Sequence, residues 1–240
     1  MLAAAAVLPV ASARADGSVC SSRLGAASVG APGRLDAWRA EVRARTAVFE
    51  RLPRKGKRPS RWLAPKDASW LLVLTRPRVA IARCWLRLRL RWRPNHAAGW
   101  VNAAKLFVER TPWRIDVSRR RRALTLVRAG ERVRAIRAVV GKPSTPTPGG
   151  LFAVVRAVRW RPDDFLGSWV LALTGHSDVL RRYDGGNGTI GIHGRGGGSL
   201  LDPLGSARSH GCIRLSNHAI DWLVHRIGGS RLPGTPVTIR

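Results

Sequence analysis

The sequence predicts a mainly β protein with one or two helices, and three observations support this prediction. Short runs of alternating apolar and polar residues recur along its 240 residues, and each run has the length of a strand. The sequence contains 25 glycines and 15 prolines, many of which separate these runs as turns. It shows neither a repeat of fixed period nor the strand–helix alternation of a parallel α/β fold. With 45% hydrophobic residues, the chain can bury a core.

Residues 1–15 are apolar and rich in alanine, and they end in Ala13-Arg14-Ala15, an A-x-A cleavage pattern. We therefore expect a signal peptide and an exported protein, located in the periplasm, the cell wall or at the extracellular face. The basic residues that usually open a signal peptide are missing, so an ordinary helix is the alternative. The run is too short to cross a bilayer and no later stretch is apolar enough, so we expect no transmembrane segment.

Residues 16–66 are predicted to form a helix followed by a basic linker. Apolar residues recur at roughly helical spacing, namely Leu35, Trp38, Val42 and Phe49. This spacing favours an amphipathic N-terminal helix over residues 34–50, although Arg45 interrupts its apolar stripe. Residues 52–65, LPRKGKRPSRWLAP, combine proline, glycine and basic residues as linkers do.

Residues 67–110 are predicted to form a small β module. Its clearest strand is WLRLRLRW at residues 85–92, in which apolar residues and arginines alternate. Further strand-like runs lie at residues 70–74, 79–82 and 99–101. Short strands that end on Gly-Trp-Val resemble a bacterial SH3-like barrel, a module found beside cell-wall enzymes. The resemblance implies a peptide- or wall-binding accessory domain, and a barrel that only packs on its neighbour is the alternative.

Residues 111–240 are predicted to form a second and larger β domain. Its expected strands are residues 113–117, 123–128, 133–140, 151–158, 169–173, 189–193 and 236–240. The segment 141–150 holds three prolines and three glycines, which excludes a helix or a central strand there. A single helix is expected over residues 216–227, with Ser216 or Asn217 as its N-cap and two glycines after its end.

The strongest chemical signal is SHGCIRL at residues 209–215, together with His193 upstream. A cysteine is a useful nucleophile as the thiolate, and a nearby His or Arg lowers the thiol pKa. If the motif is a strand, His210, Cys212 and Arg214 project from one face, since side chains repeat every two residues. Pairing with the predicted strand that ends on His193 would bring this histidine to the thiol as a general base.

The glycine in this motif also has a chemical use. Gly211 lets a substrate carbonyl approach the backbone, whose N–H groups can form an oxyanion hole. Taken singly, a cysteine or histidine can equally be a packed core residue, and zinc binding by His193, His210 and Cys212 is a further alternative. No acidic or cysteine partner stands at a metal-ligand spacing and no CxxC is present, so we expect no metal and favour nucleophilic catalysis.

These residues resemble the signature of the L,D-transpeptidase catalytic domain, the YkuD family. The resemblance is carried by His193-Gly194 and SHGCIRL, and it runs from about Pro112 to the C-terminus. Residues 140–152, VGKPSTPTPGGLF, resemble a turn typical of the family, and residues 234–239, GTPVTI, resemble its closing strand. The resemblance implies a β-sandwich catalytic domain that cross-links or remodels bacterial peptidoglycan through a cysteine acyl-enzyme.

The resemblance implies a role for each matched residue. Cys212 attacks the carbonyl of the third residue of a peptidoglycan stem peptide, and an amine acceptor then resolves the thioester. His193 takes the thiol proton and passes it to the leaving D-amino acid, while the Gly194 carbonyl orients the imidazole. The remaining matched residues shape the cleft or stabilise the oxyanion: Ser209, His210, Gly211 and Arg214. A guanidinium can also bind a substrate carboxylate through its fork. The resemblance implies no cofactor and no metal.

Two alternatives to a transpeptidase stay open. The same thioester could be hydrolysed, as in an L,D-carboxypeptidase or endopeptidase, because the long loop GRGGGSLLDPLGSAR between the two motifs can reshape the acceptor side. A non-catalytic basic protein is the second alternative, since a net charge of +29 predicts attraction to anionic cell-wall polymers. Arginines occur in both halves of the sequence, which argues against a dedicated nucleic-acid site.

Two further predictions concern cysteine pairing and another histidine. The sequence has three cysteines, of which Cys20 and Cys84 can pair in an oxidising compartment and leave Cys212 free. His176 lies in a predicted loop beside the cleft, and we interpret it as a surface or supporting residue.

Overall fold

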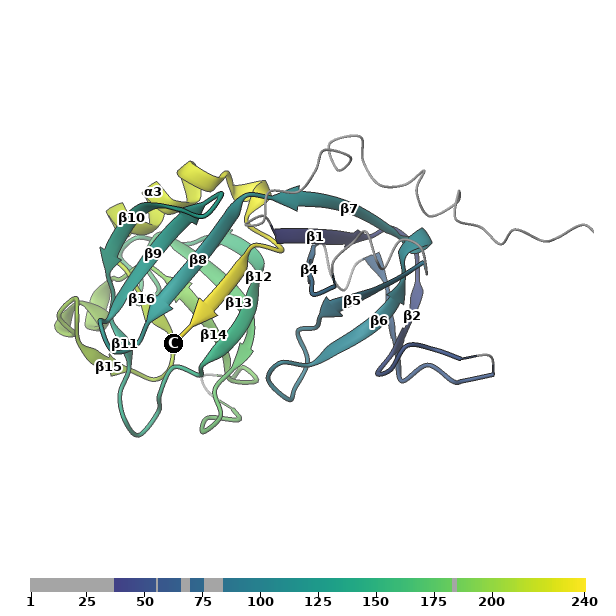
Figure 1. The fold of residues 1–240 in the computed structure, drawn as a ribbon. Coiled ribbons are helices and arrows are strands. Elements are labelled where there is room, and N and C mark those ends of the chain that lie inside the picture. Colours follow the sequence, from purple (N-terminus) through teal and green to yellow (C-terminus); the bar gives the residue numbers. More distant parts are fainter. Residues whose placement is uncertain (1–36, 55, 66–69, 76–83, 183–184) are drawn as a thin grey trace, which may run out of the picture.

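A computed structural model describes residues 37–54, 56–65, 70–75, 84–182 and 185–240. Figure 1 shows two β domains side by side, joined where strand β7 (Leu106–Thr111) is followed by β8 (Trp113–Ser118). The described part is mainly β with one α-helix, as the sequence predicts. Residues 1–15, Cys20 and residues 79–82 lie outside the described residues. The signal peptide, the Cys20–Cys84 pairing and the strand at 79–82 therefore stay predictions.

The N-terminal domain is a seven-stranded antiparallel sheet with the order β3-β2-β6-β5-β4-β1-β7. Its strands before β7 are β1 (Ala37–Val42), β2 (Thr46–Phe49), β3 (Arg61–Leu63), β4 (Leu71–Val73), β5 (Trp85–Arg89) and β6 (Ala98–Asn102). The predicted alternation at residues 85–92 is confirmed over β5, where Leu86 and Leu88 are buried and Arg87 is exposed. A short 3₁₀ helix, Ala103–Lys105, links β6 to β7.

The predicted N-terminal helix at residues 34–50 is wrong, because strands β1 and β2 occupy this segment. Trp38, Ala40 and Val42 stand at i, i+2 and i+4, a spacing that fits a strand face as well as a loose helical stripe. Strand β1 lies between β4 and β7 and hydrogen-bonds to both. This long-range pairing selects the strand over the helix. The sheet thus runs from Ala37 to Thr111 and takes in part of the expected helix and linker. Its SH3-like identity stays a prediction.

The C-terminal domain is built on an eight-stranded sheet with the order β10-β9-β8-β17-β12-β13-β14-β16. Its other strands are β9 (Ala123–Arg128), β10 (Glu131–Arg137), β12 (Gly150–Arg159), β13 (Trp169–His176), β14 (Thr189–His193), β16 (Ile213–Arg214) and β17 (Pro236–Ile239). Strands β11 (Val140–Gly141) and β15 (Ala207–Ser209) form a separate parallel pair. The seven strand segments predicted for this domain therefore all contain strands.

The eight-stranded sheet curls back on itself at β12. The first residues of β12 pair with β17, and the residues from Val154 onward pair with β13, with a register shift between Val154 and Arg156. Figure 1 shows β8, β9 and β10 in front of β14 and β16, so the two halves face each other as in a β-sandwich. Buried side chains from both halves share one apolar core, which includes Leu126, Phe152 and Ile213.

One α-helix, α3 (Asn217–Ile227), closes this core along the upper rim in Figure 1. Ser216 is its N-cap, because the Ser216 hydroxyl accepts a hydrogen bond from the Ala219 N–H. Gly228 ends the helix with a φ of 91°, a left-handed conformation that glycine adopts without a steric penalty. In the part of the chain that the structure describes, no helix combines the length and apolar composition needed to cross a membrane.

The two domains meet through a turn between β5 and β6. The Asn95 amide donates to the His176 carbonyl at 2.7 Å and accepts from the His176 N–H at 2.8 Å. The Arg93 guanidinium donates to the carbonyls of Ser177 and Asn187 at 3.0 to 3.2 Å. These bonds attach the turn to β13 and to the segment that follows β13, so the domains hold one defined arrangement.

Candidate active site

The parallel pairing of β14 with β16 brings the two halves of the motif together. Ile192 pairs with Ile213 and His193 with Arg214. Cys212 directly precedes β16, so the pairing places it beside the end of β14, from a segment nineteen residues later in the sequence. Cys212 and His193 line the same cleft of about 1370 Å³, together with His210 and Arg214.

A glycine turn, rather than a continuous strand, presents Cys212 to this cleft. Strand β15 ends at Ser209 and β16 begins at Ile213, and between them Gly211 has a φ of 118°. The Ser209 hydroxyl donates to the Cys212 carbonyl at 2.6 Å and accepts from the Gly211 N–H at 3.2 Å. The predicted alternation of His210, Cys212 and Arg214 along one strand is therefore wrong, although all three side chains reach the cleft.

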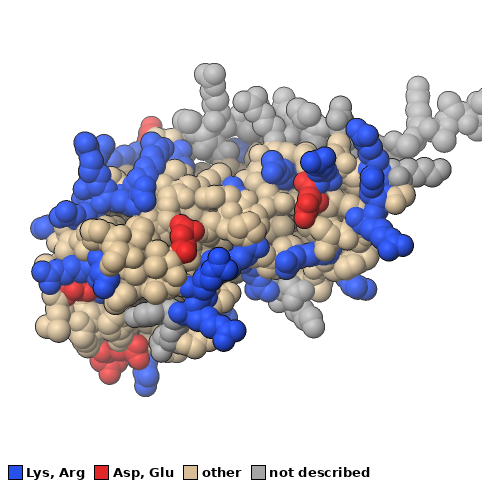
Figure 2. All heavy atoms as spheres, turned by 90° about the horizontal axis from the view of Figure 1, so that it is seen from below, with Lys and Arg blue, Asp and Glu red and all other residues tan. Residues whose placement is uncertain are grey.

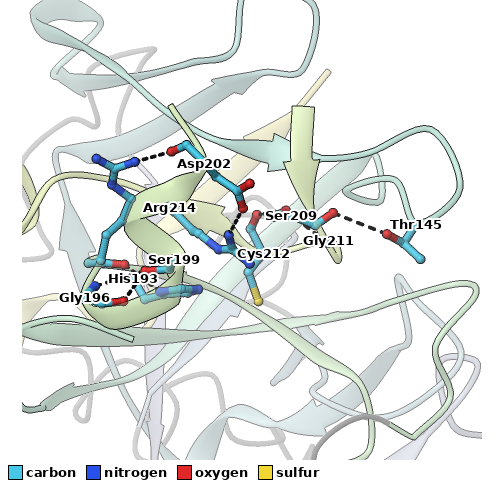
Figure 3. Close-up of polar contacts among 11 residues, drawn as sticks. Thr145, His193, Gly196, Ser199, Asp202, Ser209, Gly211, Cys212 and Arg214 are labelled. Atoms are coloured by element: carbon cyan, nitrogen blue, oxygen red, sulfur yellow. Dashed lines mark hydrogen bonds and ion pairs between the residues drawn. The ribbon is translucent and has the colours of Figure 1, made fainter. Parts of the chain in front are cut away.

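The proline-rich segment that follows β11 also hydrogen-bonds to this turn. The Thr145 hydroxyl donates to the Ser209 carbonyl at 3.3 Å, a contact that Figure 3 shows beside Gly211. Ser209 and Thr145 are both buried. The Ser209 hydroxyl therefore holds the turn through two hydrogen bonds and does not line the cleft. Its predicted supporting role stays a prediction.

His193 is buried and bound to the backbone. Its Nδ1–H donates to the Gly194 carbonyl at 2.8 Å, which leaves Nε2 as the basic nitrogen. Burial lowers the pKa of His193 to about 4, and the Gly194 carbonyl opposes this shift while the Arg214 charge adds to it. The imidazole is therefore neutral at pH 7. A side chain at Gly194 would overlap the Asn217 Oδ1, so only glycine fits there.

Cys212 is a free thiol, half-buried at the cleft surface. Burial raises its pKa above the ordinary value, while the Gly191 N–H and the Arg214 charge act in the opposite direction. The Arg214 charge thus lowers the thiol pKa as the sequence predicts, but desolvation outweighs it and the net shift is upward. Cys212 and His193 are both described, and no hydrogen bond joins the Cys212 thiol to the His193 imidazole. The raised pKa of the thiol and the lowered pKa of the imidazole make both groups neutral at pH 7.

Arg214 lines the cleft, but its guanidinium is buried and paired within the protein. Its predicted binding of a substrate carboxylate stays a prediction. Its side chain is 4% exposed, and its guanidinium donates to the Asp202 carboxylate at 2.5 Å. Figure 3 shows Asp202 above the Cys212 turn with its carboxylate directed at Arg214. The Arg195 guanidinium donates to the Asp202 carbonyl, and the Phe165 ring lies 4.7 Å from the Arg214 guanidinium carbon. Arg214 therefore ties the motif strand to the loop of residues 194–208.

Asn217 connects three segments around His193. Its Oδ1 accepts from the backbone N–H groups of Ser168 at 3.1 Å and Arg195 at 3.0 Å, and its amide donates to the Pro162 carbonyl at 2.9 Å. Asn217 is the first residue of α3, directly after the N-cap. It thus holds the segment that carries Gly194 in place, and with it the carbonyl that orients His193.

Sequence reasoning missed the roles of Asp202 and Asn217. Asp202 is the only acidic residue in the loop of residues 194–208 between the two motifs. Because the Arg214 guanidinium of the motif is always charged, this single carboxylate could have been predicted as its ion-pair partner. Asn217 was expected only as a possible N-cap, and its spacing to Gly194 offers no local signal.

Two other histidines occupy different environments. His176 is buried at the junction with the N-terminal domain and is absent from the cleft lining, so it is a supporting residue and not a surface one. His210 lines the cleft, where burial is the main cause that lowers its pKa. Across the described ranges, no three side chains of His, Cys, Asp or Glu gather in an arrangement that could hold a metal ion.

Several solved structures resemble the chain at low identity. An L,D-transpeptidase from Mycobacterium tuberculosis H37Rv is 17% identical, with 71% of this chain and 90% of that chain covered and a TM-score of 0.44. The catalytic domain from the E. faecium L,D-transpeptidase is 24% identical, with 53% and 96% covered and a TM-score of 0.39. An L,D-transpeptidase from Xylanimonas cellulosilytica is also 24% identical, with 54% and 61% covered and a TM-score of 0.39.

The family model identifies the chain more directly than these structures. No curated protein sequence matches it. The model of the YkuD L,D-transpeptidase catalytic domain matches residues 112–239, more than half of the sequence, and this range holds the complete eight-stranded sheet together with Cys212 and His193. The chain therefore belongs to the YkuD family of L,D-transpeptidase catalytic domains.

Proposed function

We propose that the protein is a peptidoglycan L,D-transpeptidase that forms a cysteine thioester with a stem peptide and transfers it to an amine acceptor, which cross-links the cell wall. The observation that supports this proposal most is the pairing of β14 with β16, which puts a free thiol and a neutral imidazole in one cleft. The substrate class comes from family membership.

The first half-reaction uses both groups. As Cys212 Sγ attacks the carbonyl carbon of the stem peptide's third residue, its proton moves to Nε2 of His193, and the C–S bond forms with a negative charge on the carbonyl oxygen. When that intermediate collapses, the bond to the terminal D-amino acid breaks and His193 returns the proton to the leaving amine. In the second half-reaction an acceptor amine attacks the thioester, and Cys212 leaves as the thiol.

The resting protonation states fit this sequence of steps. A buried His193 with a pKa of about 4 is neutral and can accept a proton at pH 7. Since the raised pKa of Cys212 keeps the thiol protonated at rest, the proton leaves only when a substrate carbonyl is in position to be attacked. The thiol is thereby protected from alkylation and oxidation between turnovers.

Cys212 itself supplies the most suitable donor for the oxyanion. The sequence suggests the Gly211 N–H as an oxyanion donor. In the structure this N–H donates to the Ser209 hydroxyl, so it is not free to bind the oxyanion. Within the described residues no partner is found for the Cys212 N–H. We assign this N–H as an oxyanion donor, held in position by the Ser209 bond to the Cys212 carbonyl.

The cellular setting belongs to the same proposal. A transpeptidase of stem peptides must reach peptidoglycan, so we propose that the protein is exported to the periplasm, the cell wall or the extracellular face. On the face that Figure 2 shows, lysines and arginines are spread over the surface with few acidic residues between them. Such a surface favours association with anionic wall polymers.

Intact-mass spectrometry tests the nucleophile. Incubation with a carbapenem should add one acyl group to the wild-type protein and none to Cys212→Ala, while a His193→Gln variant should react at least about a hundredfold more slowly. His218→Gln, a change at an exposed histidine of α3, is the matched control and should react like wild type. A folded wild-type protein that stays unmodified contradicts the proposed chemistry.

Muropeptide products then test the reaction. A disaccharide tetrapeptide should yield a cross-linked dimer and a released D-amino acid. If the only product is a trimmed stem, the thioester is resolved by water and the protein is a hydrolase.

A further inference from the structure

The N-terminal domain contributes part of the wall of the active-site cleft. Arg91 and Trp92, which follow β5, line the same cleft as Cys212 and His193. Trp92 also packs against the apolar core of the N-terminal sheet, and the Arg61 guanidinium carbon lies 4.8 Å from its ring. The cleft therefore has a wall that belongs to a different domain from its catalytic groups.

This wall is held in a fixed position by the residues that come next. Arg93 donates to the carbonyls of Ser177 and Asn187, and both of these residues line the cleft themselves. Asn95 bonds to both backbone groups of His176 and donates to the Asp178 carboxylate at 2.8 Å. Arg91 therefore lies only two residues before a turn that is hydrogen-bonded to the other side of the cleft.

The charges of the cleft are unbalanced. Among the described residues that line it, the one carboxylate is that of Asp164, which accepts from the Arg161 guanidinium and from the Leu166 N–H. Arg214 is neutralised by Asp202. Arg91 and Arg156 also line the cleft, both are exposed, and among the described residues neither has an ion pair or a side-chain hydrogen bond. Two arginines from two domains thus line the cleft without an anionic partner in the part of the chain that the structure describes.

We propose that Arg91, with Arg156 of β12 in the same cleft and Trp92 as an apolar wall, forms a subsite that binds a carboxylate of the stem peptide. This inference rests on the proposed function for the identity of the peptide, and it assigns a specificity-determining role to the N-terminal domain. A guanidinium suits this ligand, because its fork donates two parallel hydrogen bonds to a carboxylate.

Calorimetric titration of the Cys212→Ala protein tests the subsite without turnover. The ligands are a stem tetrapeptide with free carboxylates and the same peptide with every carboxylate amidated. We expect the free peptide to bind about tenfold more tightly, as a charged hydrogen-bonded pair does. Adding Arg91→Ala should remove most of this preference, and Arg91→Lys should restore part of it.

Arg87→Ala is the matched control, since Arg87 is an exposed arginine of β5 that does not line the cleft. It should retain the full preference for the free peptide. The proposal is overturned if Arg91→Ala retains the preference, if Arg87→Ala removes it equally, or if the wild-type cleft shows no preference. A carboxylate preference that depends on Arg91 in a protein whose Cys212 is never acylated would instead contradict the proposed function alone.

Discussion

At the scale of single residues, the site depends on two groups that are both uncharged at rest. Desolvation raises the pKa of Cys212 and lowers the pKa of His193, and in each case it outweighs the nearby hydrogen bonds and charges. Burial thus leaves a neutral thiol and a neutral imidazole in the cleft, where the sequence motif predicts a thiol of lowered pKa.

The thiol should consequently react slowly with a small alkylating agent at neutral pH. We predict that the rate of Cys212 modification by iodoacetamide rises with pH and is still rising at pH 9, because the reactive thiolate forms only above the ordinary cysteine pKa of about 8.5. Peptide mapping of the modified cysteine at a series of pH values measures this rate. A plateau that is reached below pH 7 would show an ionised resting thiol.

The buried neutral His193 should make stability depend on acid. Its folded-state pKa of about 4 lies below the unfolded value of 6.5, so the unfolded chain binds more protons between these values and stability falls as the pH decreases through this window. From pH 7 to 4.5 we expect wild type to lose about 2 to 3 kcal/mol more unfolding free energy than His193→Gln. Urea unfolding at both pH values measures the difference, and equal losses in the two proteins would contradict it.

At the scale of elements, the loop between the two motifs is part of the site's structure. It supplies Asp202, whose carboxylate partners the buried Arg214 of β16, and its first residues are held by Asn217 at the start of α3. Strand β16 has only two residues, so its position depends on these side-chain bonds as well as on its pairing with β14.

Removing the Asp202 charge should therefore be costly. In Asp202→Asn the Arg214 guanidinium stays buried without its counter-ion, and we expect a loss of about 3 kcal/mol in unfolding free energy. Asp116→Asn is the matched control, since it breaks the more exposed Arg114–Asp116 pair, which should cost at most about 1 kcal/mol. Denaturant titrations compare the two variants, and similar losses for both would mean that burial of the Arg214 pair has no energetic consequence.

At the scale of the whole molecule, the two sheets act as one unit around the cleft. The turn after β5 reaches across to His176, Ser177 and Asn187, and the His96 ring lies 5.0 Å from the ring of the buried Phe152. On the other side of the junction, Arg39 of β1 donates to the carbonyls of Arg231 at 2.7 Å and Pro233 at 2.9 Å. Two separate sets of contacts thus fix the domain arrangement.

Asn95→Ala should loosen the first of these sets. The His176 N–H loses its partner, so its amide should exchange with deuterium at least about tenfold faster, as expected for the loss of a hydrogen bond worth about 1.4 kcal/mol. Asn102→Ala is the control, because Asn102 caps the short helix before β7 and lies outside this junction. Exchange measured by mass spectrometry should show no change at His176 in the control. Unchanged protection in Asn95→Ala would exclude the assigned role.

The basic surface should act independently of the chemistry. We predict that binding to anionic wall polymers weakens at least about tenfold between 50 and 500 mM salt, since screening removes the attraction between exposed charges. Cys212→Ala should bind with the same affinity as wild type in a sedimentation assay. Loss of binding in this variant would mean that Cys212 has been assigned the wrong role.

The sequence by itself determined the β class, the strand segments of the C-terminal domain and the chemical motif. Alternation in a half-buried strand and the turn preferences of glycine and proline are local properties of the sequence. The motif of Cys212 and His193 can likewise be recognised from its residue types and their spacing. Strand β1 could not be assigned in this way, since Trp38, Ala40 and Val42 suit either a helix or a strand and only pairing with β4 and β7 selects the strand.

Only the tertiary structure decided the protonation of the site and the composition of its cleft. The pKa values of Cys212 and His193 follow from burial, which depends on how all the surrounding elements pack. The Asp202–Arg214 pair and the wall formed by Arg91 and Trp92 join residues that local patterns leave unrelated. Desolvation and contacts between distant segments exist only in the folded chain. The motif therefore suggests Cys212 as the nucleophile, but it shows neither the resting protonation state of the thiol nor the residues of the other domain that line its cleft.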